Sequence, residues 1–378
     1  MSIRQQNQGS IVKPGFNPLG AQTTTTTYFP YLYSWGKNNL GQLGLGNTTY
    51  YSSPKQVGAL TTWSNIVGGY AYTIATKTDG TLWAWGESLN GALGLGNTTR
   101  YSSPKQVGAL TTWLKVASGI NFTISTKTDG TLWSWGQNAN GQLGLGNTTR
   151  YSSPKQVGAL TTWLNIAGDY KFTIATKTDG TLWTWGQNAN GQLGLGNITS
   201  YSSPKQVGAL TTWLNITAGM YHTIATKTDG TLWTWGRNTN GQLGLGNITS
   251  YSSPKQVGAL TTWLKVAGGG YFTISTKTDG TLWSWGRNTN GQLGLGNRTY
   301  YSSPKQVGAL TTWLNIAGGY KFTIATKTDG TLWSWGQNAQ GQLGLGNITY
   351  YSSPKQVGAL TTWLNIAGGF YHTLATLY

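Results

Sequence analysis

Few side chains in this sequence are suited to catalysis or metal binding. The 378 residues include two histidines, eight acidic residues and no cysteine. His222 and His372 stand in one column of a 50-residue repeat, where the other copies hold tyrosine or phenylalanine. A column that accepts phenylalanine requires a flat ring, whereas a metal site needs several converging His, Cys or carboxylate groups. We therefore interpret both histidines as packing residues, and we expect no metal site, no cofactor and no disulfide.

Six of the eight acidic residues recur in an Asp-Gly pair, which is typical of a tight hairpin turn of type I′. They are Asp79, Asp129, Asp179, Asp229, Asp279 and Asp329. The remaining two, Glu87 and Asp169, fall in different copies and different loops. Because glycoside hydrolysis needs two carboxylates about 5–10 Å apart, this pair is a poor candidate for that chemistry. The sequence predicts a protein that is not an enzyme.

A glycine-rich segment, Gly-Gln-Leu-Gly-Leu-Gly at residues 141–146, returns in nearly every copy. Phosphate-binding loops of similar composition precede a helix whose N-terminal amides face the anion. Here a strand-like segment follows, and the sequence contains no Gly-Lys-Ser/Thr motif. We expect these glycines to form a structural turn.

All these features belong to a repeat that predicts an all-β fold. The segment Ser-Ser-Pro-Lys-Gln-Val-Gly-Ala-Leu-Thr-Thr-Trp begins at Ser52 and returns every 50 residues, seven times in all. Each unit reads as four short strands, expected in one copy at residues 163–167, 172–177, 181–185 and 203–207. A period of this size with strand-like segments is typical of propeller blades. We predict a single closed seven-bladed β-propeller with four-stranded blades.

The two ends of the chain predict how the ring closes. The first copy opens with its third strand, at residues 31–35, and the last copy stops after its second strand, at residues 373–378. Strands from both ends should therefore pair in a composite seventh blade, so that residues 29–378 form the propeller. Residues 1–28 form a polar arm with Arg4, Lys13 and five consecutive threonines. Two interpretations stay open for this arm, a disordered tail or a segment that docks on a neighbour.

The repeat resembles that of the regulator of chromosome condensation family. It shares Leu-Trp-x-Trp-Gly, Gly-Gln-Leu-Gly-Leu-Gly-Asn, Ser-Pro-x-x-Val and Trp-x-x-Ile-Ala-x-Gly, across residues 29–378. The resemblance implies a seven-bladed propeller and activities as varied as guanine-nucleotide exchange, chromatin binding and enzyme inhibition. The family usually has His in a Gly-x-x-His-Ser/Thr element, where five copies here have Tyr or Phe. Members that act as exchange factors carry an insertion and acidic contacts, whereas no insertion breaks the period here and only eight residues are acidic.

Comparison of the copies shows where the sequence varies. The connections between first and second strands and between third and fourth strands change, while the Asp-Gly and Gly-Ala-Leu-Thr-Thr connections scarcely do. Because adjacent strands alternate in direction, both variable connections must lie on one face of the ring. We predict a binding face of aromatic and basic residues there, although drift on a tolerant surface would give the same pattern. The candidates are Tyr70, Lys171, Tyr221, Tyr271, Tyr320, Lys321, Tyr371, Lys37, Arg100, Arg150, Arg237, Arg287 and Arg298.

Charge and hydropathy bound the function without naming a partner. The net charge is +17, and thirteen of the 25 basic residues recur at two repeat positions, which we assign to the scaffold. The sequence has no run of 18 apolar residues, so it predicts no membrane span. Its first residues lack the apolar core of a signal peptide.

The leading hypothesis is a non-enzymatic structural or interaction module. Within that class we favour a virion-associated bacteriophage protein, such as a capsid decoration or a tail adhesin, because near-perfect repeats and a polar arm occur together with no cysteine. Its partners would be virion proteins, reached through the arm, or an anionic surface or glycan. One alternative is a nucleic-acid or chromatin-like binding propeller, with weak binding because the charge is spread around the ring. The other is a guanine-nucleotide exchange factor or a protein inhibitor of an enzyme.

Overall fold

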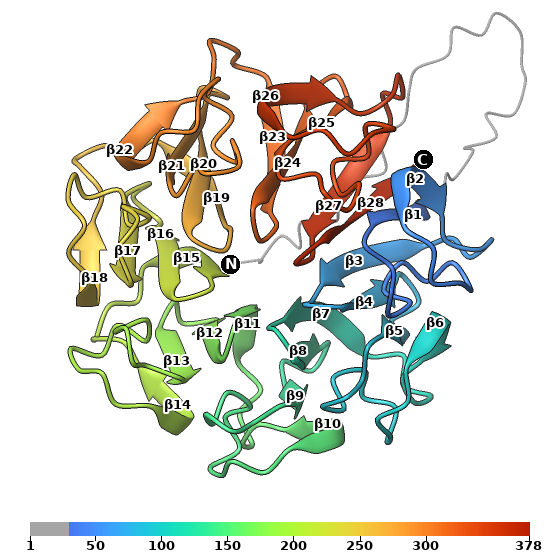
Figure 1. The fold of residues 1–378 in the computed structure, drawn as a ribbon. Coiled ribbons are helices and arrows are strands. Elements are labelled where there is room, and N and C mark those ends of the chain that lie inside the picture. Colours follow the sequence, from blue (N-terminus) through green and yellow to red (C-terminus); the bar gives the residue numbers. More distant parts are fainter. Residues whose placement is uncertain (1–29) are drawn as a thin grey trace, which may run out of the picture.

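The computed structural model describes residues 30–378. Seven four-stranded antiparallel sheets surround a central channel, and no helix occurs in this part of the chain (Figure 1). The prediction of an all-β, seven-bladed propeller is confirmed. A search of the same residues finds no helix that is long and apolar enough to cross a membrane.

Each blade has one strand at the channel, two in the middle and one at the rim. The channel strands are β3 (Trp63–Gly68), β7 (Trp113–Ser118), β11 (Trp163–Asp169), β15 (Trp213–Gly219), β19 (Trp263–Gly268), β23 (Trp313–Gly318) and β27 (Trp363–Gly368). The second strands are β4 (Tyr72–Lys77), β8 (Phe122–Lys127), β12 (Phe172–Lys177), β16 (His222–Lys227), β20 (Phe272–Lys277), β24 (Phe322–Lys327) and β28 (His372–Leu377).

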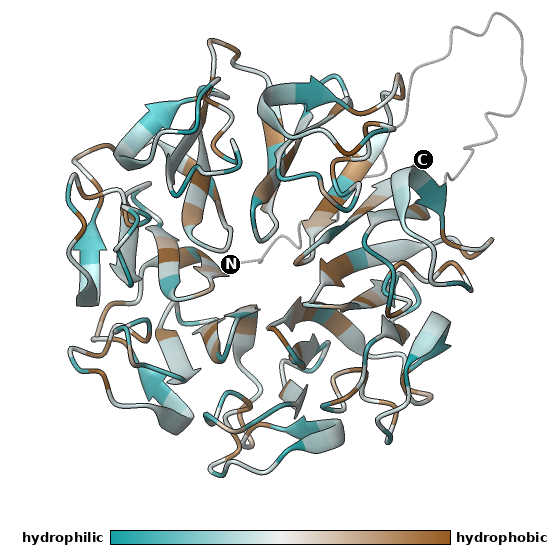
Figure 2. Cartoon of the chain, in the orientation of Figure 1, coloured by the Kyte–Doolittle hydropathy of each residue, from teal (hydrophilic) through white to brown (hydrophobic). Residues whose placement is uncertain are grey.

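The third strands are β1 (Tyr31–Gly36), β5 (Leu82–Gly86), β9 (Leu132–Gly136), β13 (Leu182–Gly186), β17 (Leu232–Gly236), β21 (Leu282–Gly286) and β25 (Leu332–Gly336). The rim strands are β2 (Tyr51–Gln56), β6 (Tyr101–Gln106), β10 (Tyr151–Gln156), β14 (Tyr201–Gln206), β18 (Tyr251–Gln256), β22 (Tyr301–Gln306) and β26 (Tyr351–Gln356). Figure 2 shows hydrophilic residues on the rim strands and hydrophobic residues on the strands nearer the channel. A proline and a lysine in every rim strand suit an edge that must not pair with another chain.

The seventh blade combines both ends of the described chain, in the order β2-β1-β28-β27. The pairing of β1 with β28 runs without a break from Tyr31 opposite Leu377 to Gly36 opposite His372. In Figure 1 the first strands therefore lie beside the last ones, blue next to red. This confirms the predicted closure, with β28 spanning 372–377 rather than 373–378.

The Asp-Gly turns differ from the type I′ prediction, in which both central residues would have positive φ. Among the described residues other than glycine, only Thr62 and Tyr170 have positive φ, so Asp79 does not. The amide of Gly80, at φ +76°, donates to the carbonyl of Lys77 at 3.0 Å. The turn is thus a type I turn followed by a left-handed glycine, which gives a three-residue hairpin loop.

Tryptophans and the glycine-rich loops join adjacent blades. The buried Trp85 donates its indole N–H to the carbonyl of Gln42 in the preceding blade at 3.0 Å. Gly44 packs against the same indole so closely that a Cβ would lie 2.7 Å from its nitrogen. Its φ of +73° also favours glycine. Equivalent contacts recur around the ring, so the glycine-rich segment forms a turn that docks one blade on the next.

The repeated lysines of the second strands pack on tryptophan. In one blade the Lys127 ammonium lies 3.7 Å from the ring centroid of Trp133 and 4.9 Å from that of Trp113. Burial lowers the pKa of Lys127, and the nearby Asp129 carboxylate opposes that shift. These cations contribute to packing within the blade and leave little charge for a partner.

Candidate functional site

The structure confirms that the two variable connections of each blade lie on one face. The amide of Glu87 donates to the carbonyl of Ala71 at 2.9 Å, which joins the third-to-fourth connection to the first-to-second connection. On the opposite face, the amide of Thr78 in the Asp-Gly turn donates to the carbonyl of Thr62 at 2.9 Å. We call the first the variable face and the second the constant face.

Aromatic side chains form an almost continuous series around the channel mouth on the variable face. Tyr320 stacks on Phe370 with ring centroids 3.9 Å apart, and Phe370 lies 4.7 Å from Tyr70. The series continues from Tyr320 through neighbouring blades, with centroid separations of 4.6–6.2 Å. We call this set the aromatic arc; its members are Tyr70, Tyr170, Tyr221, Tyr271, Tyr320, Phe370 and Tyr371.

Backbone hydrogen bonds between blades hold the loops that carry the arc. The amide of Phe370 donates to the carbonyl of Gly69 at 3.2 Å, and that of Tyr70 donates to Ile120 at 3.3 Å. Gly270 donates in the same way to Tyr320 at 3.2 Å. Because these bonds order the loops before any partner arrives, the arc is a preorganised surface.

Five of the predicted cations lie over rings of the arc. The Arg237 guanidinium is 5.5 Å from the ring centroid of Tyr221 and 5.4 Å from that of Tyr271. The guanidinium of Arg287 lies 5.5 Å from the ring centroid of Tyr271. Lys171, Lys321 and Lys37 lie 4.9–5.2 Å from the rings of Tyr170, Tyr320 and Tyr371, respectively. The structure thus brings together the five predicted tyrosines and these five cations.

The other three predicted residues, Arg100, Arg150 and Arg298, lie elsewhere on the variable face. All three are exposed and precede the rim strands. Arg150 donates to the carbonyl of Leu89 at 3.3 Å. Among the described residues, these three arginines make no cation–ring contact, in contrast to the other five predicted cations. That these rim arginines share a binding face with the arc stays a prediction.

The charge of the arc comes from its cations. Burial raises the pKa values of Tyr221, Tyr320 and Tyr371, so their phenols stay neutral at physiological pH. Asp169 ends β11 at the channel wall, and burial raises the pKa of its carboxyl to about 7. Its Oδ1 accepts a 2.5 Å hydrogen bond from the amide of Tyr170, whose φ is +36°. The only other acid of the variable connections, Glu87, lies on a third-to-fourth connection.

Both histidines lie inside the blades, where the packing interpretation places them. His222 and His372 are fully buried, and burial lowers the pKa of each to about 3. The Nε2 of His222 lies 3.0 Å from the hydroxyl oxygen of Thr273 in the next blade. His372 is similarly placed, 3.2 Å from that of Thr73. Each is therefore a neutral ring with one hydrogen bond across a blade interface.

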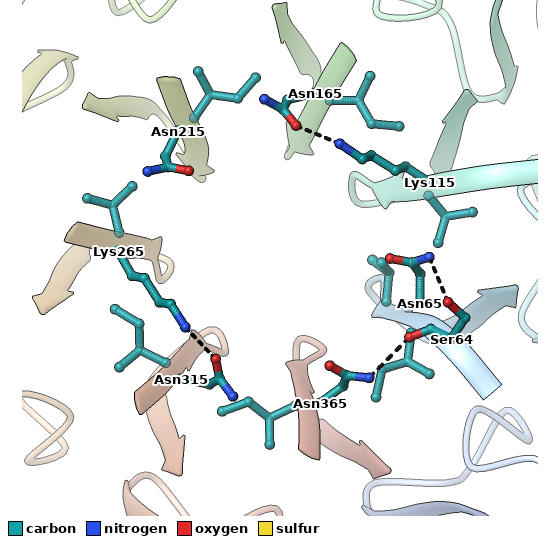
Figure 3. A pocket seen from close by; sticks show the side chains of 16 residues that line it. Ser64, Asn65, Lys115, Asn165, Asn215, Lys265, Asn315 and Asn365 are labelled. Carbon is teal, nitrogen blue, oxygen red and sulfur yellow. Dashed lines mark hydrogen bonds between the residues drawn. The ribbon is translucent and has the colours of Figure 1, made fainter. Parts of the chain in front are cut away.

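A polar ring inside the channel was not among the predicted sites. It consists of Asn65, Lys115, Asn165, Asn215, Lys265, Asn315 and Asn365, at one position of the seven channel strands. With Ser64 and the neighbouring Ile and Val side chains, it lines a cavity of about 510 Å³ toward the constant face (Figure 3). We call this set the channel ring. The sequence could have pointed to this position, because two copies have lysine where the other five have asparagine.

Hydrogen bonds from the channel ring join successive blades. The amide nitrogen of Asn65 donates to the carbonyl of Leu114 at 2.9 Å, and Asn365 closes the circle at Ser64 with 3.2 Å. Lys115 donates to Asn165 Oδ1 at 2.8 Å and Lys265 to Asn315 Oδ1 at 2.7 Å. The ring therefore contributes to closure of the propeller and also places two ammonium groups in the channel.

Exposed leucines on the constant face were also missed, because they belong to the least variable segment of the repeat. Each is 40–50% exposed. They are Leu60, Leu110, Leu114, Leu160, Leu164, Leu210, Leu214, Leu260, Leu264, Leu310, Leu314 and Leu360.

Comparison with known protein families identifies the repeat. Residues 112–375 match the RCC1-like domain. Residues 31–76 and 79–125 each match the regulator of chromosome condensation (RCC1) repeat. No curated protein sequence matches the chain.

Solved structures with the same fold come from human and yeast proteins. Human WBSCR16 superposes with a TM-score of 0.83 at 20% identity, over 92% of this chain and 98% of that one. Prp20p from Saccharomyces cerevisiae, described with its binding properties to Gsp1p and histones, gives 0.84 at 19% identity, over 93% and 92%. Yeast RCC1 (Prp20) bound to Kap60 gives 0.84 at 18% identity, over 99% and 96%. At these identities the likeness shows the fold alone.

Proposed function

The chain belongs to the RCC1-like β-propeller family, and from that premise we propose that it is a non-enzymatic binding module whose aromatic arc takes an acidic segment of a partner protein. The family acts by binding or exchange rather than by catalysis. The observation that carries the proposal is the stacking of five cations on the arc, at one mouth of the channel.

Aromatic and arginine side chains dominate the binding energy of protein interfaces, because they combine a large contact area with specific polar groups. The arc offers both on loops that are already ordered. Arg237 and Arg287 lie 5.4 and 5.5 Å from the ring centroid of Tyr271, so an acidic segment laid over this ring would meet two guanidinium groups. The arc itself contains no carboxyl group, and burial raises the pKa of the nearest channel-wall carboxyl, Asp169 beside Tyr170, to about 7. An acidic partner therefore matches the face in charge.

The relatives support protein binding in a general way. The yeast propeller is described with Gsp1p, histones and Kap60 as binding partners. Guanine-nucleotide exchange stays the alternative that this family suggests. The virion role favoured from the repeat stays a hypothesis, since these human and yeast proteins add no support for it.

Nucleic acid is the second candidate, because stacked aromatics with cations also bind single strands. Two features favour a protein instead. The rings of the arc contact one another, and Tyr320 stacks on Phe370, which leaves those ring faces partly covered. The cations are also divided between arc and rim rather than lined up in a groove.

The test is fluorescence anisotropy with labelled poly-L-glutamate, with duplex DNA as the competing polyanion. The variant is R237Q/R287Q, because glutamine already stands at this position as Gln137, Gln187 and Gln337. Loss of two ion pairs with the ligand at about 0.5–1 kcal/mol each predicts affinity weaker by ~5–30-fold. The charge-matched control K155Q/K305Q removes two exposed rim-strand lysines, and its affinity should stay within about twofold.

Equal weakening in variant and control would show that only net charge matters, and the arc would lose its role. Tighter binding of DNA than of poly-L-glutamate would favour the nucleic-acid class. A third variant, R100S/R150S, introduces the serine that stands at this position as Ser200 and Ser250. Weaker binding by this variant would show that these rim arginines belong to the same binding face.

A further inference from the structure

The two lysines of the channel ring are cations without a carboxylate beside them. The cavity of about 510 Å³ is lined by Asn, Ser, Ile, Val and Lys side chains, and its lining includes no acid. Lys115 and Lys265 are half-buried, and burial lowers the pKa of each with no acidic group opposing it. By contrast, each second-strand lysine such as Lys127 has an aspartate nearby.

Closure of the propeller does not require these lysines. In the other copies an asparagine makes the same connection to the next blade, for example Asn165 to the carbonyl of Leu214 at 3.2 Å. Lys115 replaces that bond with one to Leu164 at 3.0 Å. Lysine therefore adds a partly desolvated charge where an uncharged side chain already completes the ring, and that charge has a cost unless something compensates it.

Two further changes accompany each lysine. Val116 and Val266 stand where the other copies have isoleucine, and Ser125 and Ser275 where they have alanine. The Ser125 hydroxyl donates to the carbonyl of Lys115 at 2.7 Å, and Ser275 donates to Lys265 at 2.8 Å.

The two lysine-bearing copies lie three blades apart, and that spacing recurs elsewhere in the chain. It also relates Lys171 to Lys321 and His222 to His372, which indicates duplication of a three-blade unit. In a ring of seven, a separation of three blades one way and four the other places the two ammonium groups on nearly opposite sides of the channel. Figure 3 shows Lys115 and Lys265 on opposite sides of the cavity, each reaching toward the asparagine of the next blade.

We propose that the channel ring binds a small oxyanion carrying two or more negative charges, a polyphosphate or a polycarboxylate, which bridges Lys115 and Lys265. Lys265 uses one of its three N–H groups on Asn315, and Lys115 uses two, on Leu164 and Asn165. The remaining lysine N–H groups and the second amide protons of Asn165, Asn315 and Asn365 are the donors for the anion. Asn65 and Asn215 donate theirs to threonine hydroxyls. This site opens toward the constant face and shares no residue with the aromatic arc, so it stands or falls independently of the proposed function.

The test is isothermal titration calorimetry of the full chain with sodium tripolyphosphate and, in a separate arm, with citrate. The variant K115N/K265N places in both copies the asparagine that the other five already carry, so the ring of inter-blade hydrogen bonds is preserved. The control K155Q/K305Q removes the same charge from the rim strands of the same two blades, β10 and β22. Thermal melting of each protein shows that it is folded.

We expect one anion bound per chain, affinity at least about tenfold weaker in K115N/K265N, and affinity within about twofold in the control. The single variants K115N and K265N should each give an intermediate loss, and they serve if the double variant fails to fold. Binding of tripolyphosphate but not citrate would assign the ligand to the phosphates, and the reverse to the carboxylates. No binding of either anion, or equal affinity in variant and control, would overturn the proposal.

Discussion

Removal of the last strand should destabilise the propeller far more than its small size suggests. Within residues 30–378, no turn joins the second strand β28 to its third strand β1, and the two are held by hydrogen bonds and packing. Deleting residues 373–378 takes away Leu374, which is 0% exposed, and Leu377, which is 7% exposed. Loss of each large buried side chain costs about 2–5 kcal/mol. The sum, about 4–10 kcal/mol, is comparable to the 5–15 kcal/mol by which domains are typically stable.

The assay is calorimetric melting, with a milder variant that isolates packing from strand pairing. Leu374 lies in one cluster with Leu32, Trp63 and Trp85, which spans the junction between the seventh and first blades. Leu374→Ala should therefore lower the free energy of unfolding by about 2–5 kcal/mol. Leu360→Ala is the matched control, because Leu360 is 50% exposed and its truncation should cost under about 0.5 kcal/mol.

The truncated chain should melt markedly lower, or aggregate through the exposed edges of β1 and β27. Removal of residues 1–27, which lie outside the described residues, should leave the melting temperature nearly unchanged. If the chain without residues 373–378 melted like the full chain, the pairing of β28 with β1 could not be what closes the ring.

Three further measurements test the buried carboxyl, a buried histidine and the binding of DNA. Burial raises the pKa of Asp169 from the usual range of a carboxyl, about 4, to about 7. The unfolded chain therefore loses this proton first, and the stability of the fold falls as pH rises from about 4 to 7. Asp169→Asn should flatten that loss in melts compared between pH 4.5 and 8. His222→Phe introduces the ring of the neighbouring copies, so it should lower the melting temperature less than Leu374→Ala does. Duplex DNA should bind weakly and be released near physiological salt, because its phosphate contacts exchange with counterions; salt-tolerant, sequence-selective binding would contradict our order of hypotheses.

The blades could be predicted because their determinants are local and repeated. Alternating apolar residues identified the second strand at Phe172–Lys177, and the structure has the same bounds. The closure at β28 could be predicted because the two incomplete copies complement each other. The turn after the second strand was predicted less well, because its geometry depends on Thr78 as well as on the Asp-Gly pair.

The site could be predicted only in part, because sequence places loops on a face but does not give distances between them. Tyr70 and Tyr271 were found because their loops vary, and Arg100 was grouped with them for the same reason, although it lies at the rim. Lys115 and Lys265 were missed because the sequence does not show which side chains of a channel strand line the cavity and which pack inside the blade. Only the closed propeller shows that Asn65 and its counterparts in the other six blades line one cavity together.

Departures from repeat symmetry are the strongest guide to what the chain does. A packing position can hold the same residue in every copy, as the fully buried tryptophans of the third strands show. A position that differs between copies therefore needs another explanation. In the arc, residues three blades apart along the chain are not all the same. Tyr271 corresponds to Asn121, and Phe370 corresponds to Met220. In the channel ring, residues three blades apart along the chain are the same, and two lysines replace the asparagine of the other copies. A symmetric propeller thus carries one asymmetric aromatic surface and, toward the other mouth of its channel, one pair of lysines on opposite sides.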